Sequence, residues 1–204
     1  QELSVMFTGI SEGVGKISSY VEENDIVCLE IMHSLALDDI CVNDSICCSG
    51  ICLTVVKTDG NTFNVEMVPE TIERSNAKYW EIGTIINLER AMLQSTRMGG
   101  HYLQGHVDTV SEIKEIKNFE NSSVFTFGLD KEVDKYIVEK GYIGLDGLSL
   151  TIAKKRLNTI DIALIPHTLS ITNFSDKKIS DFVNLEIDIV AKYVENFIKP
   201  HIEK

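Results

Sequence analysis

The stretch that decides the fold is GICLTV at residues 50–55, which returns as GLSLTI at residues 147–152. When the sequence is shifted by 97 positions, residues 50–89 align with residues 147–186 without a gap, and 13 of the 40 aligned pairs are identical. Chance would give only about two or three identities at average residue frequencies. Because this period is too long for one unit of a solenoid, it indicates two copies of a whole domain.

The two copies set the expected domain boundaries. VPETIERSN at residues 68–76 matches IPHTLSITN at residues 165–173, and INLE matches VNLE near the end of each copy. We therefore place the boundary near residue 97. The sequence predicts an N-terminal domain over residues 1–97, a C-terminal domain over residues 98–187 and a separate tail over residues 188–204.

Short segments rich in Val, Ile, Leu, Thr and Phe alternate with turn signals such as Leu157-Asn158 in both copies. Short strands at regular spacing are typical of a closed β-barrel or a β-sandwich, so each half is predicted to be all-β. A short helix is expected over residues 131–139, ending at Gly141, with a counterpart over residues 33–39. The predicted strands are 51–58, 62–69, 85–91, 124–129, 148–154, 160–166 and 182–187.

The tail differs from both copies because its apolar residues recur with a helical period. Residues 188–199 carry apolar side chains at i, i+1, i+4, i+5, i+8 and i+9, counted from Ile189. This spacing predicts an amphipathic helix with Asp188 as its N-cap and Pro200 as its stop. The apolar stripe can fold back on a barrel or meet the same stripe in other subunits. We favour association between subunits, because each barrel is complete without the tail.

Composition excludes several classes of protein. The chain has 204 residues, of which 44% are hydrophobic and 25% charged, as in ordinary globular proteins. A net charge of -12 repels polyanions, so binding to nucleic acid is not expected. No apolar run approaches the roughly 20 residues needed to cross a bilayer, so no membrane association is expected. QELSV at residues 1–5 has neither a basic nor an apolar region, so no secretory signal is expected, and since it precedes a Met we leave it out of the fold reasoning.

The five cysteines predict a reducing compartment. Their number is odd, and four of them fall within twelve residues, whereas the disulfides of a secreted protein are paired and spread along the chain. We therefore expect free thiols in a cytoplasmic protein. No C-x-x-C motif is present, so we expect small buried apolar side chains rather than a metal site. The cysteines are Cys28, Cys41, Cys47, Cys48 and Cys52.

Seven long motifs follow one another along the chain, namely MFTGI at 6–10, GICLTV at 50–55, NLERA at 87–91, RMGGHYLQGHVD at 97–108, GYIGLDGLSLTI at 141–152, LIPHTLSITNF at 164–174 and VNLEID at 183–188. In this order they resemble riboflavin synthase of the alpha-subunit type, which has two lumazine-binding repeats. The resemblance covers the chain from Met6 to the tail helix. It is specific, because several long and unusual motifs occur in the right order.

The resemblance implies a fold, an assembly and a reaction. Family members have two tandem six-stranded antiparallel Greek-key β-barrels and a C-terminal α-helix through which they form homotrimers. They bind two molecules of 6,7-dimethyl-8-ribityllumazine, and one donates a four-carbon unit to the other, giving riboflavin and 5-amino-6-ribitylaminouracil. No metal or redox cofactor takes part, and the site lies between the N-terminal barrel of one subunit and the C-terminal barrel of its neighbour. The resemblance also suggests an association with lumazine synthase.

Two pairs of side chains at equivalent positions are candidates for the site, with Ser149, Thr151 and Cys52 as catalytic residues and Thr54 as a binding residue. Ser149 and Thr151 are two residues apart, so they share one face of a strand, and Cys52 and Thr54 are their equivalents in the first copy. The hydroxyls can simply be satisfied by neighbouring backbone, and the thiol can be a buried apolar group. With the family resemblance, we expect Ser149 to polarise the substrate ring or hold the attacking oxygen, and Cys52 to face the substrate.

Histidine and lysine side chains supply further candidates. His106 can cap a turn, but its ordinary pKa near 6.5 suits proton transfer, so we expect acid/base catalysis or substrate orientation. His101 is expected to be structural. Lys140 can be a solvated surface charge, yet the resemblance places it in the binding site. Glu70 and His167 occupy equivalent positions and are expected to bind ribityl hydroxyls.

The resemblance also places Phe7 and Thr8 beside the ligand, where an aromatic ring can pack on the heterocycle. Six main-chain segments are expected to supply amide and carbonyl partners for the pteridine edge, in a pocket with few but well-placed polar groups. The predicted substrate-binding set contains Phe7, Thr8 and the candidates Cys52, His106, Lys140, Ser149 and Thr151. Its other members are Gly9, Ile10, Ser11, Leu53, Thr54, Glu66, Met67, Val68, Pro69, Glu70, Thr71, Gly105, Val107, Leu150, Leu164, Ile165, Pro166, His167, Thr168 and Leu169.

The motif around Ser49 departs from the family pattern, and two other functions are compatible with parts of the sequence. Family members usually have Asn in a motif close to VNGVCLTV, where this chain has Ser49 in CSGICLTV, so local hydrogen bonding is expected to differ. An antenna protein of the same fold would bind lumazine or flavin without turnover. We favour the enzyme, because the reactive polar residues of both copies are present. A flavin-dependent reductase would need a nicotinamide-binding domain, and no G-x-G-x-x-G motif supports one.

Overall fold

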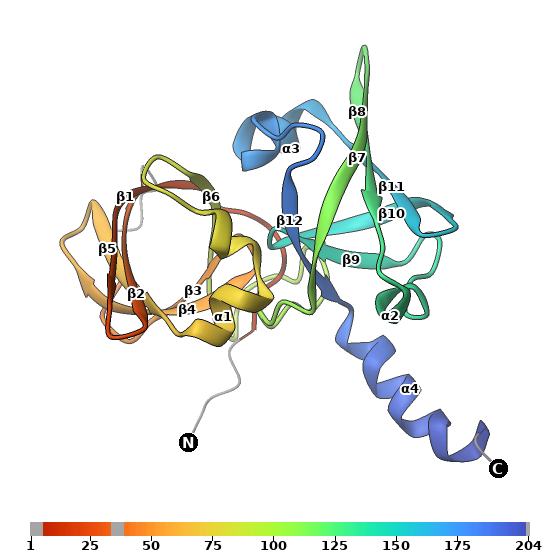
Figure 1. Ribbon diagram of the computed structural model, residues 1–204, viewed down its shortest axis with the longest axis horizontal. Helices are drawn as coiled ribbons and strands as arrows, with labels where there is room; N and C mark the ends of the chain where they lie inside the picture. The colour runs from red at the N-terminus through yellow and green to blue at the C-terminus, as the bar shows by residue number, and fades with distance from the viewer. Residues whose placement is uncertain (1–5, 34–38, 203–204) are drawn as a thin grey trace.

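The computed structural model describes residues 6–33 and 39–202, which form two β-barrels and a projecting C-terminal helix (Figure 1). Each barrel is closed and contains six antiparallel strands. The barrels stand side by side, and residues 91–108 connect the last strand of the first to the first strand of the second. The predicted all-β fold with two six-stranded barrels is therefore confirmed.

In the first barrel the strand order is β1-β2-β5-β4-β3-β6, and β6 pairs with β1 to close the sheet. β2 and β3 follow one another in the chain but are not neighbours, which makes this a Greek-key arrangement. The strands are β1 (Gly13–Glu23), β2 (Ile26–His33), β3 (Ser45–Cys48), β4 (Ile51–Thr58), β5 (Thr62–Met67) and β6 (Ile85–Arg90).

The second barrel repeats this topology. Its strand order, β10-β11-β8-β7-β12-β9, is the order of the first barrel with each strand number raised by six, written from another starting point. The strands are β7 (Thr109–Phe119), β8 (Ser122–Gly128), β9 (Tyr142–Leu145), β10 (Leu148–Arg156), β11 (Thr159–Leu164) and β12 (Phe182–Ile187).

Both barrels also bend at equivalent places. The register of β1 shifts between Ile17 and Ser19, and that of β7 shifts between Ile113 and Glu115. β4 and β10 carry a second equivalent pair of shifts. Bulges of this kind increase the local twist and bend of a strand, which helps a sheet to close. The sequence repeat is thus a repeat of structure down to its irregularities.

The predicted strands are all present, with ends within two residues of those predicted. Sequence analysis did not place β1, β2, β3, β7 or β9. β3 and β9 have only four residues each, and β7 carries charged residues along its exposed half. Such strands are held by their neighbours in the sheet rather than by an apolar pattern of their own.

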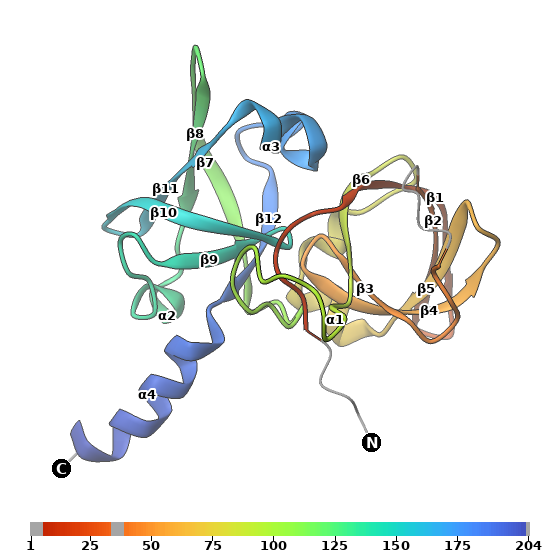
Figure 2. The same ribbon diagram turned by 180° about the vertical axis from the view of Figure 1, so that it is seen from behind.

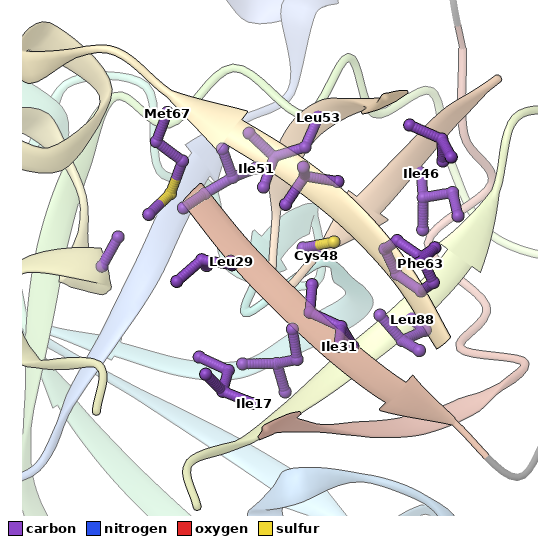
Figure 3. Packing of buried hydrophobic residues seen from close by; sticks show 14 of the residues in the cluster. Ile17, Leu29, Ile31, Ile46, Cys48, Ile51, Leu53, Phe63, Met67 and Leu88 are labelled. Atoms are coloured by element: carbon purple, nitrogen blue, oxygen red, sulfur yellow. The ribbon is translucent and has the colours of Figure 1, made fainter. Parts of the chain in front are cut away.

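Alternation of side chains along the strands builds an apolar core in each barrel. In β2, Val27, Leu29 and Ile31 point inward and are buried, whereas the residues between them are partly exposed. Figure 3 shows this core, with Phe63 and Cys48 reaching the same interior from other strands. The second barrel has an equivalent core that contains three mutually packed phenylalanines.

Short helices connect strands at equivalent points of the two barrels. Helices α1 (Pro69–Arg74) and α3 (Pro166–Ile171) each begin with a proline in the first turn, where its missing N–H costs nothing. They lead into the 3-10 turns η1 (Asn76–Tyr79) and η2 (Asn173–Ser175).

The helix expected over residues 131–139 is much shorter than predicted. α2 (Lys131–Asp134) is a single turn, and a residue of positive φ (67°), Lys140, precedes β9. The chain must reach β9 within a few residues, so tertiary structure overrides the local helical pattern. Most of the helix expected over residues 33–39 lies outside the described residues, and its first residue, His33, belongs to β2.

The tail forms α4 (Ile189–Ile202), which projects away from both barrels (Figure 1). Asp188 Oδ1 accepts a hydrogen bond from Val190 N at 3.0 Å, as expected of the N-cap. The prediction that Pro200 stops the helix is wrong, because Pro200 lies inside it. A proline this close to the end costs the helix only one of its last backbone hydrogen bonds, and this small loss is why the final turn tolerates it. Among the described residues, no helix is long and apolar enough to cross a membrane.

Two hairpin turns meet where the barrels touch. Ser49 and Gly50 join β3 to β4 with φ values of 45° and 87°, and Asp146 and Gly147 join β9 to β10 with 44° and 79°. Positive φ at both positions is typical of a type I′ hairpin turn. A Cβ at Gly147 would lie 2.8 Å from Gly50 N, so only glycine permits this approach.

Asparagine side chains extend the joint on both sides of these turns. Asn184 Nδ2 donates to Asn76 Oδ1 at 2.8 Å, and the equivalent pair, Asn87 Nδ2 and Asn173 Oδ1, lies at 3.0 Å. The pairs cross from one barrel to the other and follow the same repeat, which gives the joint an approximate two-fold symmetry. Asp146 breaks the symmetry, because its buried carboxylate pairs with Lys177 at 3.1 Å where the first copy has Ser49.

Candidate functional site

Two segments that precede the barrels cross over between them (Figure 2). We call residues 7–11, before β1, and residues 103–107, before β7, the leading segments. They pair with each other, because Phe7 N donates to Leu103 O at 2.8 Å and Leu103 N donates to Phe7 O at 3.1 Å. This pairing lies at the joint between the barrels.

Each leading segment then binds a strand of the other repeat. Gly9 O accepts a hydrogen bond from Ser149 N at 2.8 Å, and Gly105 O accepts one from Cys52 N at 2.9 Å. Gly9 and Gly105 have φ values of 76° and 73°, which favour glycine. A Cβ on either would lie 2.5–2.6 Å from the facing strand residue. The candidate catalytic residues Ser149 and Cys52 are therefore fixed by backbone from the opposite half of the chain.

A cavity of about 230 Å³ opens beside Cys52. Six of its nine lining residues belong to the predicted substrate-binding set, and they come from both repeats. The lining residues are Ile51, Cys52, Glu70, Thr71, Arg74, Ser75, Gly105, His106 and Val107. The structure thus brings together residues that lie far apart in the sequence.

A larger cavity, of about 700 Å³, lies near the same barrel but holds few of the predicted residues. Of the predicted set, only Thr8 and Ile10 line it. None of the candidate catalytic side chains opens into it, so the smaller cavity beside Cys52 is the better candidate for chemistry.

The Cys52 thiol is partly buried beside this smaller cavity. Burial raises its pKa above the ordinary value, and a hydrogen bond with Ser45 lowers it by less. At neutral pH the side chain is therefore a thiol rather than a thiolate. Since the thiolate is the strong nucleophile, Cys52 is better suited in this state to contact substrate than to attack it.

Ser149 has a different partner at the equivalent position of the second barrel. His101 Nδ1 lies 2.6 Å from Ser149 Oγ, and the imidazole stacks on Tyr142 with ring centroids 5.3 Å apart. Burial lowers the pKa of His101, while the charge of Asp188 raises it by less, so the imidazole is neutral at neutral pH. A neutral imidazole can accept the hydroxyl proton, as in other serine–histidine pairs.

His101 was expected to be structural, which stays a prediction, and its contact with Ser149 was not predicted. A clue lies in the glycine that precedes it. A Cβ at Gly100 would lie 2.3 Å from Thr8 O and 2.5 Å from Ser149 Cβ, so His101 reaches Ser149 only because residue 100 is glycine. The contact itself spans 48 residues and has no local signal.

Several other predicted residues can be placed by their burial. Phe7, Leu53, Met67 and Leu164 are buried among apolar side chains, so only their backbone can face a ligand. His106, Glu70, His167, Thr54 and Thr151 are exposed, while Lys140 Nζ donates to Ala153 O at 2.8 Å beside β10. The role of each in binding stays a prediction.

Two buried glutamates that bind the backbone of the leading segments were not predicted. Glu89 in β6 accepts hydrogen bonds from Thr8 N at 2.6 Å and Gly9 N at 2.9 Å. Its equivalent, Glu186 in β12, accepts from Gln104 N at 2.6 Å and Gly105 N at 3.0 Å. The two glutamates are one of the identical pairs of the repeat, and this identity was the only sequence feature that could have pointed to them. Their hydrogen-bond partners are backbone amides, which no side-chain motif reveals.

These glutamates are unusual acids. Burial raises the pKa of Glu89 to about 7 and that of Glu186 to about 7, although hydrogen bonds from the leading segments lower both. Cys47 lies close enough to both carboxylates for them to raise the pKa of its thiol, in addition to burial. The carboxyl groups of Glu89 and Glu186 are therefore partly protonated at near-neutral pH.

The cysteines and potential metal ligands can be placed directly. All five cysteines are free, as expected of reduced thiols. Cys48 lies in the core of the first barrel, whereas Cys47 lies on the opposite side, against Phe7 and Leu103. Within residues 6–33 and 39–202, no three His, Cys, Asp or Glu side chains gather as a metal site.

Comparison with known families shows which class of protein has this fold. The lumazine binding domain family matches the chain twice, over residues 8–91 and 104–188. Each match includes all but the first residue of one leading segment and all six strands of one barrel. The chain is therefore a protein with two lumazine-binding domains, each of which folds as one barrel.

Relatives specify the class further. The chain is 42% identical over 193 residues to riboflavin synthase from Bacillus subtilis, covering 95% of this chain and 90% of the relative. It is 43% identical over 199 residues to riboflavin synthase from Schizosaccharomyces pombe, covering 97% and 96%. The chain belongs to the riboflavin synthase family.

Solved structures confirm the fold alone. The crystal structure of LumP complexed with riboflavin matches with a TM-score of 0.83 at 23% identity, covering 89% of this chain and 98% of that chain. The crystal structure of LumP complexed with 6,7-dimethyl-8-(1'-D-ribityl) lumazine matches with a TM-score of 0.80 at 22% identity, with the same coverage.

Proposed function

We propose that this enzyme converts two molecules of 6,7-dimethyl-8-ribityllumazine into riboflavin and 5-amino-6-ribitylaminouracil, by moving a four-carbon unit from one molecule to the other. The synthases among its relatives support this reaction. The observation that carries it is the pair of equivalent sites, one with Cys52 against Gly105 and one with Ser149 against Gly9. Two copies of one site suit a reaction between two copies of one substrate.

The approximate two-fold symmetry supports a specific mode of catalysis. Two identical lumazines must meet face to face in inverse orientation, and duplicated pockets can present them so. Fixing both reactants removes the entropy cost of a bimolecular encounter, which contributes about 7–11 kcal/mol in well-oriented systems. The heterocycle supplies much of the reactivity, so the protein has mainly to position the rings and help to move protons.

We propose the following roles for the candidate catalytic residues. Ser149, with His101 as its proton acceptor, polarises a substrate ring or holds the attacking oxygen. Cys52 faces the substrate in the equivalent site, and His106 at the same cavity assists proton transfer. Lys140 and Thr151 contact the ligand in the second barrel.

The other predicted residues form the walls of the two pockets. Glu70 in the first barrel and His167 in the second bind ribityl hydroxyls through side chains that are exposed in this structure. The backbone of segments 9–11, 52–54, 66–71, 105–107, 149–151 and 164–169 binds the pteridine edges. No metal or redox cofactor takes part in the proposed reaction.

Assembly follows from α4 in this proposal. The exposed apolar side chains of α4 pack between subunits of a homotrimer, and the working site forms between the first barrel of one subunit and the second barrel of its neighbour. We propose domain boundaries at residues 1–97, 98–187 and 188–204, a cytoplasmic location, and an association with lumazine synthase as further expectations.

The alternative antenna function is not favoured. LumP is similar at only 22–23% identity, which speaks for the fold, whereas the synthases are similar at about 40% over nearly the whole chain. The serine–histidine contact in the second barrel also suits turnover rather than ligand storage.

A direct assay tests the proposed function. Purified protein is incubated with 6,7-dimethyl-8-ribityllumazine, and riboflavin is followed by its fluorescence while both products are measured by chromatography. We expect one riboflavin and one 5-amino-6-ribitylaminouracil for every two lumazines consumed. Absence of riboflavin above the spontaneous rate, with lumazine retained unchanged on the protein, would favour the antenna function instead.

A further inference from the structure

Glu89 and Glu186 have no part in the reaction proposed above, yet both are almost fully buried. Among the described residues, neither is in a salt bridge, and the hydrogen bonds of each carboxylate come from one leading segment. Burying a carboxyl group is unfavourable unless its hydrogen bonds compensate. Because a buried carboxyl group occurs at both equivalent positions, we ask how its hydrogen bonds to a leading segment affect the candidate site that this segment contacts.

Hydrogen bonds can be followed from Glu89 into the second barrel. Glu89 belongs to β6 of the first barrel and holds Thr8 N and Gly9 N. The carbonyl of the same glycine accepts from Ser149 N at 2.8 Å, and Ser149 belongs to β10 of the second barrel. One residue, Gly9, thus connects the carboxyl group of one barrel to the candidate catalytic serine of the other.

The equivalent path runs in the opposite direction. Glu186 belongs to β12 of the second barrel and holds Gln104 N and Gly105 N. The carbonyl of Gly105 accepts from Cys52 N at 2.9 Å, and Cys52 belongs to β4 of the first barrel. The two paths therefore cross, and they meet where Phe7 pairs with Leu103.

We propose that Glu89 and Glu186 are positioning residues that act crosswise, so that the glutamate of each barrel sets the position of the candidate catalytic residue of the other barrel. This inference rests on the proposed function for the identity of the sites, but the hydrogen-bond paths do not depend on it. Placement of one pocket is thereby linked to the other barrel. In the proposed trimer, where each working site joins the first barrel of one subunit to the second barrel of its neighbour, this link connects two working sites through one chain.

Both carboxyl oxygens are needed for this role. In each barrel, one oxygen accepts from the first backbone amide and the other accepts from the second. A glutamine keeps the shape but offers one acceptor, and its NH2 group faces a backbone N–H that cannot accept. Glu89→Gln and Glu186→Gln therefore each release one amide of one leading segment and leave the other segment intact.

Hydrogen exchange of the backbone, followed by mass spectrometry of peptides, distinguishes a crossed effect from a general loss of stability. In Glu186→Gln, we expect the peptide that contains Cys52 to exchange about tenfold faster, while the peptide that contains Ser149 changes less than twofold. Glu89→Gln is the matched control and is expected to show the reverse pattern. Equal acceleration in both peptides, or acceleration confined to the mutated barrel, overturns the proposal.

Turnover gives a second reading that a purely structural role would not produce. Because each variant misplaces one reacting group without emptying its pocket, we expect kcat for lumazine to fall about tenfold with KM within threefold. An unchanged kcat in a variant with the crossed exchange pattern overturns the positioning role while leaving the hydrogen-bond paths intact.

Two outcomes keep this test separate from the proposed function. If the wild-type protein makes no riboflavin, the proposed function fails, whereas the exchange pattern still decides the crossed role. If Glu186→Gln does not fold, Glu186→Asp and Glu89→Asp replace the pair, since a carboxylate shorter by one methylene also weakens the contact. The same crossed pattern is expected, and its absence overturns the proposal.

Discussion

At the scale of residues, the two barrels place different chemistry at equivalent positions. Ser149 and Cys52 occupy the same place in the repeat, and each donates its backbone N–H to a glycine of the opposite leading segment. Ser149 has a neutral imidazole at 2.6 Å, whereas burial keeps the Cys52 thiol protonated. The two positions are therefore equivalent in their backbone contacts and differ in the groups that surround their side chains.

The first prediction concerns Ser149. Ser149→Ala removes the hydroxyl beside His101 and leaves the strand intact, so turnover is expected to fall about 100-fold, with the melting temperature within a few degrees of wild type. Riboflavin formation and thermal denaturation check both parts. Ser122→Ala, at the tip of the β7–β8 hairpin, is the control. A normal rate in Ser149→Ala would remove the proposed role.

The second prediction concerns pH and Glu186, whose pKa is raised from 4.5 to about 7 by burial. Between these values the folded state binds more protons than the unfolded state, so the contribution of Glu186 to stability is complete below pH 4.5 and is lost as pH rises through 7. Lys192 and Asp108 face the group and act in opposite directions. In Glu186→Gln, the fall of the unfolding free energy with pH should be shallower by up to about 1.4 kcal/mol per pH unit.

Urea denaturation at pH 5, 6, 7 and 8 measures that slope for wild type and variant. The comparison is between slopes, because glutamine also lowers stability at every pH by losing one hydrogen bond. Parallel curves for the two proteins would show that Glu186 does not carry a proton in the folded state at near-neutral pH.

Sequence alone could predict part of this arrangement. The repeat made Ser149 and Cys52 equivalent, since identical glycines and leucines flank them, and the family resemblance made them catalytic candidates. His101 and the two glutamates escaped, since their partners are a distant hydroxyl and distant backbone amides. Such contacts exist only after two barrels have been brought together, so no local pattern records them.

At the scale of elements, regular apolar strands were predictable and irregular ones were not. β4 and β12 match their predicted bounds because their apolar residues are continuous or alternate clearly. β9 is held by β10 and β12 on either side and needs little pattern of its own. In α4, the helical period predicted the element and its N-cap, whereas Pro200 was tolerated within the last turn.

The third prediction concerns α4, whose apolar residues stay exposed in the single chain, with Phe197 70% and Tyr193 58% exposed. Apolar exposure of this extent on one face is typical of an interaction surface. Deleting residues 188–204, or introducing Phe197→Glu, should convert the proposed trimer to monomers with little activity. Analytical ultracentrifugation and the riboflavin assay measure both effects.

Lys199→Glu provides a control for that experiment, because it places the same acidic side chain at an exposed position on the opposite face of the helix from Phe197. This variant is expected to stay associated and active. Full activity from a proven monomer would contradict a site that is shared between subunits.

At the scale of the whole molecule, the repeat generates a symmetric joint. The hairpin turns at Gly50 and Gly147, the asparagine pairs and the leading segments all follow the same approximate two-fold axis. Sequence analysis predicted two barrels but not this joint, since the turn signals gave no indication that the turns would meet. Ser49, where the chain departs from the family motif, lies in this joint. Its equivalent in the second barrel, Asp146, forms a buried ion pair that a serine cannot form.

The fourth prediction concerns that joint. Gly147→Ala would place a Cβ 2.8 Å from Gly50 N in a residue of positive φ, so we expect a loss of about 2–4 kcal/mol in unfolding free energy. Gly60→Ala is the control, because it has a φ of 92° but its Cβ would meet nothing within 4 Å. Denaturant unfolding of both variants separates the clash from the backbone strain. Equal losses would show that the contact between the turns contributes nothing.

The central claim is that duplication produced two equivalent lumazine pockets, one in each half of the chain. Calorimetric titration of the intact protein with a non-reacting lumazine analogue tests it most directly. The account predicts two analogue molecules bound for each chain. Failure to bind at all, or a single site that Cys52 and Ser149 variants show to lie in one barrel only, would contradict it.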